Sequence, residues 1–290
     1  MKPAALAYYA PTNLRQALRL LAEAGPGGAP LAGGQSLIPQ LNARSRRPSS
    51  VVDLNGVSGL DAITYGPDGL RIGARARLQS LLTHPLILQR QPVLAEAVGK
   101  VAHYTIRQRA TLGGSLCHAD PAAELPAVAV ALGARLTVES LSGSRCVIAA
   151  DFFTGPYSTS LHAGELLTYV EFPPLPQFRF VFAEVSRRTA VGLPLVALCL
   201  GVSLEEGVIG QARAAAAGVA DRPVRLTACE EKLRGLPLGG GGLDRALAAV
   251  GEGPAPPSDQ HGNARYRTAL LRSLLCRCAD RLRNLEALHD

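Results

Sequence analysis

The chain has 290 residues, of which 47% are hydrophobic, so it is long enough to form two domains around a substantial core. Its net charge of +7 comes from arginines that are spread along the sequence, and aromatic residues make up only 4%. A nucleic-acid-binding surface needs clustered basic residues and stacking rings, so we exclude that class of protein. The longest apolar run, residues 193–204, contains a proline and a glycine and is shorter than the roughly 20 residues that span a bilayer.

We therefore expect no membrane span. The apolar start of the chain is also too short for a secretory signal, so we expect a cytoplasmic protein. The cysteines show no repeated spacing, which is typical of reduced, buried thiols and not of disulfides or an iron–sulfur site. They are Cys117, Cys146, Cys199, Cys229, Cys276 and Cys278.

The N-terminal residues, about 1–55, predict a small α/β unit. Leucines recur at helical spacing after Thr12 and Asn13, which can cap a helix, and a run of glycine and proline ends the pattern. Short apolar segments predict the strands. The predicted order is a strand at residues 8–9, a helix over 12–24, a strand over 29–32, a helix over 35–42 and a strand over 51–54.

Residues 56–176 predict a second unit, in which turn residues connect hairpins and apolar helices lie between them. A proline-rich segment, residues 173–176, marks the best domain boundary. The predicted strands are at 60–65, 70–74, 134–139, 145–148 and 165–172, and the predicted helices are at 78–82, 92–102 and 122–132.

Residues 177–290 predict a separate C-terminal domain in which helices cover a sheet. Its strands are predicted at 178–186, 195–204 and about 208–217, and its helices at 224–234, near 243–250 and at 264–283, with a flexible glycine run at 239–242. The predicted fold class is therefore α+β: two small α/β subdomains followed by an antiparallel sheet with helices.

Two glycine pairs stand out. Gly33-Gly34 follows a short apolar strand, and Gly113-Gly114 precedes Asp120-Pro121, which can cap a helix and occupy its first position. Glycine lets successive backbone N–H groups turn toward one point and approach a phosphate closely. Each pair alone is also typical of an ordinary tight turn. Together, they suggest that one diphosphate is held from both sides.

Short hydroxyl side chains lie beside both glycine pairs. Ser36, Thr111 and Ser115 can donate hydrogen bonds to phosphate oxygens, although simple capping of the turns is an equally good explanation.

Three polar side chains follow the second glycine pair. Asp120 and Glu124 are four residues apart at a predicted helix start, so they share a face and can accept hydrogen bonds from sugar hydroxyls; pairing with the helix N-terminus also explains them. We favour a sugar contact for Glu124 and leave Asp120 between a cap and a contact. His118 can contact a bound phosphate or ring, or only pack there.

Other site classes find no support in the sequence. No Gly-x-Gly-x-x-Gly opens a helix and no Gly-x-x-x-x-Gly-Lys-Ser/Thr occurs, so neither a Rossmann dinucleotide site nor a phosphoryl-transfer loop is predicted. No Ser-His-Asp arrangement indicates hydrolysis, and we assign no catalytic side chain.

Three stretches, residues 31–37, 106–126 and 164–173, resemble the FAD-binding medium subunits of the molybdenum hydroxylases, such as those of carbon monoxide dehydrogenase and xanthine dehydrogenase. The resemblance implies a PCMH-type fold in which subdomains of about 1–55 and 56–176 clasp a non-covalent FAD, followed by the C-terminal domain 177–290. The residues it places at the cofactor are Leu31, Ala32, Gly33, Gly34, Gln35, Ser36, Leu37, Ala110, Thr111, Gly113, Gly114, Ser115, His118, Asp120, Glu124 and Leu167.

The resemblance also implies partner subunits. A small subunit would carry [2Fe-2S] clusters and a large one the molybdenum-pterin cofactor, in a dimer of heterotrimers that passes electrons to FAD and then to an external acceptor. The sequence departs from the family pattern on both sides of Arg187-Arg188. The family usually carries a lysine a few residues before these arginines, where this chain has Ala183-Glu184-Val185, and an acidic residue after them, where it has Ala190-Val191. The alternatives are a stand-alone FAD-dependent oxidase and a redox-silent nucleotide-binding module.

Overall fold

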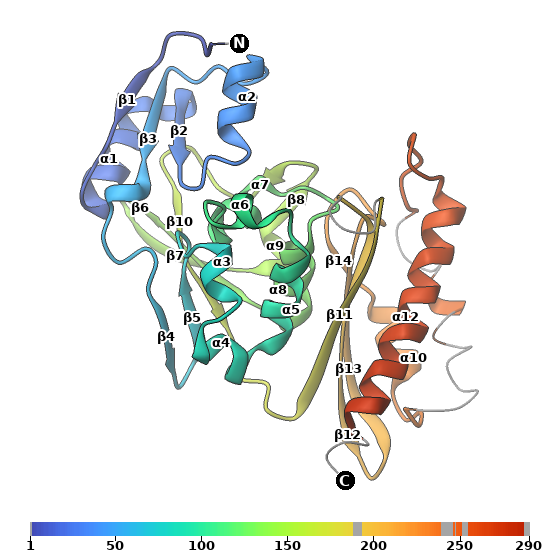
Figure 1. Ribbon diagram of the computed structural model, residues 1–290. Helices are drawn as coiled ribbons and strands as arrows, with labels where there is room; N and C mark the ends of the chain where they lie inside the picture. Colours follow the sequence, from blue (N-terminus) through green and yellow to red (C-terminus); the bar gives the residue numbers. More distant parts are fainter. Residues whose placement is uncertain (1, 188–192, 239–245, 247, 251–254, 287–290) are drawn as a thin grey trace.

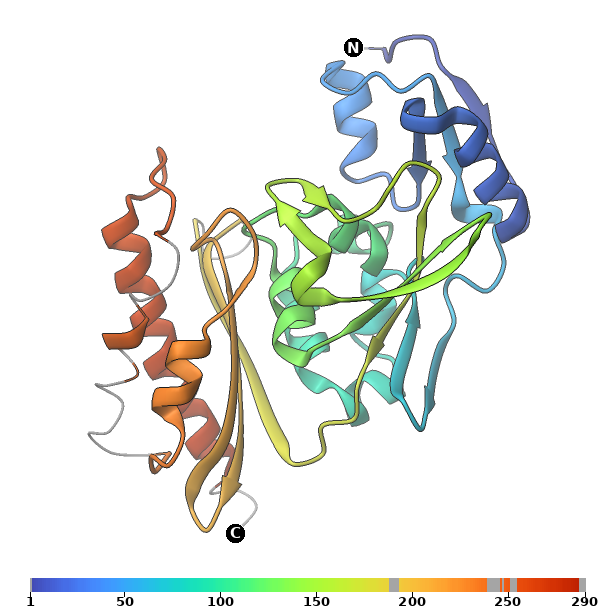
Figure 2. The same ribbon diagram turned by 180° about the vertical axis from the view of Figure 1, so that it is seen from behind.

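The computed structural model describes residues 2–187, 193–238, 246, 248–250 and 255–286. Figures 1 and 2 show three bodies in a row: a small N-terminal sheet with its helices, a middle sheet with short helices, and a C-terminal sheet backed by the long helix α12 (Ala264–Glu286). This arrangement confirms the α+β fold class.

The N-terminal unit is a three-stranded parallel sheet of order β1-β3-β2. Its core forms because Ala17, Leu18 and Leu21 lie on one face of α1 and pack against Val52 of β3. The elements are β1 (Ala7–Tyr9), α1 (Leu14–Ala24), η1 (Gly25–Gly27), β2 (Gly28–Leu31), α2 (Leu37–Ala43), β3 (Ser50–Asp53) and η2 (Leu54–Gly56).

The middle unit is built on a five-stranded antiparallel sheet of order β4-β5-β10-β6-β7. Helix α8 is apolar on all sides and entirely buried, so it forms the centre of this unit. The strands are β4 (Ile63–Gly66), β5 (Gly69–Gly73), β6 (Arg135–Ser140), β7 (Gly143–Ile148), β8 (Phe153–Gly155), β9 (Ser158–Thr159) and β10 (Leu166–Phe172). The helices are α3 (Leu78–Leu81), α4 (Pro85–Arg90), α5 (Pro92–Lys100), α6 (Tyr104–Arg107), α7 (Leu112–His118), α8 (Glu124–Leu132) and α9 (Ala149–Phe152).

The C-terminal unit is an antiparallel sheet of order β11-β12-β13-β14, and it is covered on both faces. Its elements are β11 (Phe178–Ser186), β12 (Pro194–Glu205), β13 (Val208–Ala217), β14 (Val224–Arg225), α10 (Thr227–Leu233) and α12 (Ala264–Glu286). In β12, Ala197 and Cys199 face the middle unit, whereas Val196 and Leu198 join the cluster under α12. A strand that is buried on both faces needs apolar side chains on both, which explains why residues 194–202 form an uninterrupted apolar run.

Polar contacts tie the middle unit to the C-terminal unit. Glu96 of α5 accepts a hydrogen bond from the Phe182 backbone N–H (3.1 Å) and pairs with Arg281 of α12 (2.6 Å). Arg281 also donates to the Phe182 carbonyl (2.7 Å). Side chains from α5 of the middle unit and from α12 of the C-terminal unit therefore both bind the backbone of Phe182 in the edge strand β11. These contacts join the two units.

The structure corrects some sequence-based expectations. The helix expected over 122–132 begins at Glu124, and Val224 and Arg225 form strand β14 before the helix expected at 224–234. Cys146 is exposed, contrary to the expected burial, whereas Cys199, Cys229 and Cys278 are buried. Helices α4, α6 and α9 were not predicted. The glycine run 239–242 and most of the helix near 243–250 lie outside the described residues.

The longest helix of the described chain, α12, carries many charged residues. None of the described helices is both long and apolar enough to cross a bilayer.

Candidate functional site

The loop between β2 and α2 presents an open row of backbone donors. Gly34 has a φ of +73°, in the left-handed region that favours glycine, and the Gln35 side chain donates to the Gly33 carbonyl (3.1 Å). Within the described chain, no acceptor bonds to the backbone N–H groups of residues 33–36. The prediction of an open glycine turn before a helix is confirmed here, and its four N–H groups are available to an anion.

The second glycine pair has a different structure. Gly113 and Gly114 lie inside the first turn of α7, which Thr111 caps by accepting a hydrogen bond from the Gly114 N–H (3.1 Å). The Gly113 N–H donates to the Ala74 carbonyl (2.7 Å). The expectation of an open nest followed by a helix is therefore wrong for this pair, because the helix begins before the glycines and both N–H groups already have protein acceptors, Ala74 and Thr111.

The two glycine segments touch each other. A Cβ at Gly33 would lie 2.4 Å from the Arg109 carbonyl oxygen and 2.9 Å from the Ala110 Cα, closer than atoms can approach. A Cβ at Gly113 would lie 2.5 Å from the Ala74 Cβ, so this glycine lets α7 pack against the end of β5. The structure thus brings residues 31–37 and 110–115 together, as predicted, through glycine contacts made by backbone atoms.

The start of α8 places a buried carboxyl group beyond α7. Asp120 was a candidate cap for this helix, but it does not cap it. Its Oδ1 accepts a hydrogen bond from the Ala122 N–H (2.9 Å), in a turn that ends before the helix begins at Glu124. Glu124 is 6% exposed, and burial raises the pKa of its carboxyl to about 7. No side chain of the described residues donates to it, so it can accept a hydrogen bond from a ligand hydroxyl.

A tyrosine that sequence reasoning missed lies against two of the predicted residues. The Tyr157 hydroxyl donates to Asp120 Oδ2 (3.4 Å), and its ring centre is 5.2 Å from that of His118. Burial, and then the Asp120 charge, raise the pKa of Tyr157, while the Arg187 charge lowers it. Only its position after Gly155-Pro156 could have indicated that Tyr157 sits at a turn, where its φ is +53°.

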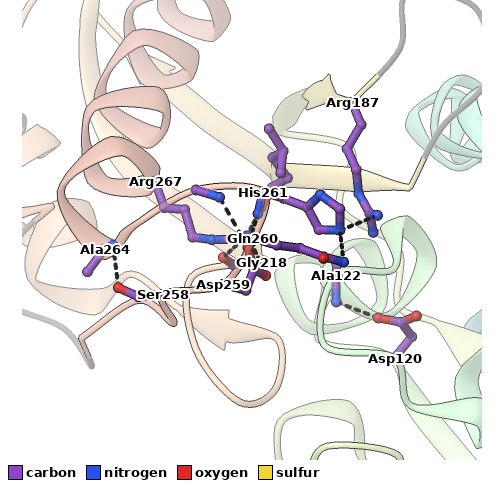
Figure 3. Close-up of polar contacts among 12 residues, drawn as sticks. Asp120, Ala122, Arg187, Gly218, Ser258, Asp259, Gln260, His261, Ala264 and Arg267 are labelled. Atoms are coloured by element: carbon purple, nitrogen blue, oxygen red, sulfur yellow. Dashed lines mark hydrogen bonds and ion pairs between the residues drawn. The ribbon is translucent and has the colours of Figure 1, made fainter.

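The C-terminal unit closes this side of the site. Arg187, at the end of β11, lies 2.7 Å from His261 Nε2, and Figure 3 shows this pair facing the turn that holds Asp120 and Ala122. The Asp259 carboxylate accepts hydrogen bonds from the His261 N–H (2.8 Å) and from Arg267 (2.7 Å), which fix the loop that carries His261. The Arg187 guanidinium of the C-terminal unit thus reaches the end of the site at which α8 begins.

The structure describes Ala183, Glu184 and Val185, where the sequence departs from the family pattern, and of these Glu184 carries an ionisable side chain. Its Oε2 atom is buried without a hydrogen-bond partner, and burial raises the pKa of its carboxyl to about 7. The Glu184 charge also contributes to the raised pKa of Glu124. Ala190 and Val191 lie outside the described residues.

The remaining predicted residues take three kinds of position. Ser36 and Ser115 are half-buried beside the two glycine segments. Leu37 is a buried anchor of α2, and Leu31 packs in the same cluster. Leu167 lies within β10, buried in the hydrophobic cluster that also holds Leu116. Leu167 therefore contributes to the hydrophobic core and not to a polar contact in the site.

These features fit a dinucleotide and not a metal. Four backbone N–H donors without an acceptor in the described chain, a glycine contact that a Cβ would prevent, and a buried carboxyl to which no described side chain donates match a diphosphate that carries sugar hydroxyls. Within the described residues, no group of three or more His, Cys, Asp or Glu side chains could hold a metal ion.

Known proteins match this chain along most of its length. The family "FAD binding domain in molybdopterin dehydrogenase" matches residues 4–175, and "CO dehydrogenase flavoprotein C-terminal domain" matches residues 181–282. The 6-hydroxypseudooxynicotine dehydrogenase complex subunit alpha of Paenarthrobacter nicotinovorans is 38% identical, over 95% of this chain and 93% of its own. The glyceraldehyde dehydrogenase medium chain of Sulfolobus acidocaldarius is 34% identical, over 94% of this chain and 97% of its own.

A solved structure shows the same fold. Quinoline 2-oxidoreductase from Pseudomonas putida 86 contains a chain with a TM-score of 0.92 and 36% identity, which covers 97% of this chain and 98% of its own. Since the family match spans more than half of the sequence and relatives above 30% identity match nearly its full length, this chain belongs to the family of FAD-binding medium subunits of molybdenum-containing dehydrogenases.

Proposed function

We propose that this chain is the FAD-carrying electron-transfer subunit of a heteromeric molybdenum hydroxylase. The observation that carries the proposal is the open row of N–H donors at residues 33–36, which lies directly against the second glycine segment. FAD supplies the redox chemistry when bound, and the protein contributes binding, orientation and burial.

The residues divide into three roles in this proposal. The N–H groups of residues 33–36 and the hydroxyls of Ser36 and Ser115 bind the diphosphate. Glu124 accepts a hydrogen bond from a sugar hydroxyl, because its buried carboxyl has no other side-chain donor. His118 and Asp120, which Tyr157 contacts, would lie beside the bound cofactor, where His118 could contact its phosphate or ring and Asp120 a sugar hydroxyl.

Relatives support the assignment to a multi-subunit enzyme. Their names describe a "medium chain", a "medium subunit" and a "complex subunit", and this chain covers nearly their full length. We propose the same arrangement here: a small iron–sulfur subunit, a large molybdenum-cofactor subunit and this chain, in a dimer of heterotrimers in the cytoplasm.

The substrate is set elsewhere in such an enzyme. The relatives' names mention glyceraldehyde, 6-hydroxypseudooxynicotine, caffeine, nicotine and carbon monoxide, although their medium subunits share this fold family. The stand-alone oxidase needs a substrate domain of its own, and the family matches leave no such segment between residues 4 and 282.

The proposal is tested by purifying the protein from its native cells and identifying what it carries. We expect about one FAD per chain, released intact by acid, and co-purification with an iron–sulfur chain and a larger molybdenum-containing chain in equal numbers. FMN in place of FAD would contradict the diphosphate site. A monomer that oxidises a substrate unaided would instead support the stand-alone oxidase.

A further inference from the structure

Two side chains connect the glycine segments to each other. Asn55, in η2 directly after β3, donates from Nδ2 to the Ala32 carbonyl (3.1 Å), so it holds the loop that leads into the first glycine pair. Its Oδ1 accepts a hydrogen bond from the Arg77 guanidinium (2.5 Å). Arg77, which precedes α3, donates from its other terminal nitrogen to the Arg109 carbonyl.

The Asn55 amide is itself held in place. Asp53 Oδ1 accepts hydrogen bonds from the Asn55 backbone N–H (2.9 Å) and from Nδ2 (2.6 Å). The other Asp53 oxygen accepts a hydrogen bond from the Tyr8 hydroxyl (2.5 Å). These bonds fix which end of the Asn55 side chain points at Arg77, because Nδ2 already faces two acceptors.

The Arg109 carbonyl is the atom against which Gly33 packs. The position of a Cβ on Gly33 is 2.4 Å from this oxygen, so the spacing of the two segments is set at the contact that Arg77 holds. The backbone of Arg77 forms a bridge with Thr111, and the Leu78 N–H donates to the Ala110 carbonyl (2.9 Å), which anchors the second segment to the same turn.

We propose that Asn55 and Arg77 form a bracket that fixes the separation of the two glycine segments, and that both are positioning residues for the diphosphate of the cofactor. This inference rests on the proposed function. The bracket joins the N-terminal unit to the middle unit at the point where the two units meet around the site.

The alternative role for Arg77 is simple attraction of an anion by its charge. The geometry favours the bracket, because the planar guanidinium donates in two directions at once, to Asn55 and to Arg109. A lysine keeps the charge but cannot reproduce this fork, so Arg77→Lys separates the two roles. The matched control is Arg75→Met, because Arg75 is two residues away and pairs with Asp61 (2.7 Å) outside the bracket.

The experiment measures the FAD dissociation constant of the full-length chain after removal of its bound flavin, at low and at high salt. We expect Arg77→Lys and Arg77→Met to weaken FAD binding by about tenfold, to a similar extent at both salt concentrations, because hydrogen-bond geometry is less sensitive to screening than a free charge. Arg75→Met should bind like the wild type. Asn55→Ala, at an exposed position, should weaken binding by several-fold without lowering the unfolding midpoint of the flavin-free chain.

A second probe locates the effect. ADP carries the diphosphate without the flavin, so the bracket variants should lose affinity for ADP by the same factor as for FAD. Wild-type affinity in Arg77→Lys, or a loss confined to FAD, would overturn the bracket while leaving the FAD function standing. If the wild-type chain binds no FAD at all, the proposed function fails and the bracket fails with it.

Discussion

The two glycine pairs look alike in the sequence but act differently in the structure. Gly33-Gly34 lies in a loop whose N–H groups have no acceptor in the described chain. Gly113-Gly114 lies inside helix α7, and its N–H groups donate to Ala74 and Thr111. The first pair therefore offers donors to a ligand. The second pair lets α7 approach the end of β5 closely, so it supports the site by packing and contributes side chains around it.

The comparison teaches that a glycine pair does not reveal whether its N–H groups are free. What distinguishes the two cases is the residue two positions before the glycines. Thr111 caps the helix that contains the second pair, while Leu31, in the same position before the first pair, has no side-chain acceptor that could cap a helix. Substitutions at the two pairs and at the side chains around them test this division.

Gly113→Ala should destabilise the protein itself. The new Cβ would meet the Ala74 Cβ at 2.5 Å and its carbonyl oxygen at 2.8 Å, so the backbone of α7 must shift. We expect a loss of about 3 kcal/mol in the free energy of unfolding, measured by urea titration of the flavin-free chain. Gly99→Ala is the control, because its Cβ finds only ordinary contact with Leu82 at 3.7 Å, and its stability should not fall.

Glu124→Gln should remove part of the pH dependence of stability. Burial raises the pKa of Glu124 from 4.5 to about 7, so the folded chain holds this proton more tightly than the unfolded chain. The resulting contribution is complete below pH 4.5 and is lost as the pH rises to about 7, by at most about 3 kcal/mol. The free energy of unfolding of the flavin-free chain, measured by urea titration, should fall less steeply between pH 5 and pH 8 in the variant than in the wild type. The same slope in both would mean that Glu124 is solvated.

Gly33→Ala should separate binding from folding. The added Cβ pushes the loop away from the Arg109 carbonyl, so the FAD dissociation constant should rise by at least about tenfold, or about 1.4 kcal/mol. The unfolding free energy of the flavin-free chain should change by less than about 1 kcal/mol, because a loop that is only partly buried can move. Gly66→Ala adds a Cβ with nothing within 4 Å and serves as the control.

The smallest effects are expected at the hydroxyls. Ser36 makes no capping hydrogen bond with its side chain, so Ser36→Ala should weaken FAD binding by a few-fold without changing stability. Ser115→Ala should do the same from the other segment. Fluorescence titration with FAD measures both variants, and a stability loss without an affinity loss would return these serines to a structural role.

Much of the fold follows from local patterns in the sequence. The apolar runs and turn residues predict most strands of the three larger sheets to within a few residues, because burial alternates or persists along each strand, whereas the short strands β8, β9 and β14 were missed. The short helices α4, α6 and α9 escape prediction because they have four to six residues, too few to show a helical period.

The site was predictable only in part. The glycines, Ser36, Ser115 and Glu124 lie in motifs, so the sequence points to them directly. Asn55, Arg77 and Tyr157 come from separate segments and act through contacts 22 to 37 residues apart in sequence, which no local pattern reveals. The error about the Gly113-Gly114 nest has in part the same origin, because the Gly113 N–H donates to the carbonyl of Ala74, far away in the chain.

The most direct test of the division between the two glycine segments is hydrogen–deuterium exchange of their backbone amides, measured on the full-length chain with and without FAD. The amides of residues 33–36 have no acceptor in the described chain, so they should exchange rapidly without FAD and become protected when it binds. Those of residues 112–115 are already hydrogen-bonded and should be protected in both states. Protection gained at 112–115, with no change at 33–36, would contradict the account.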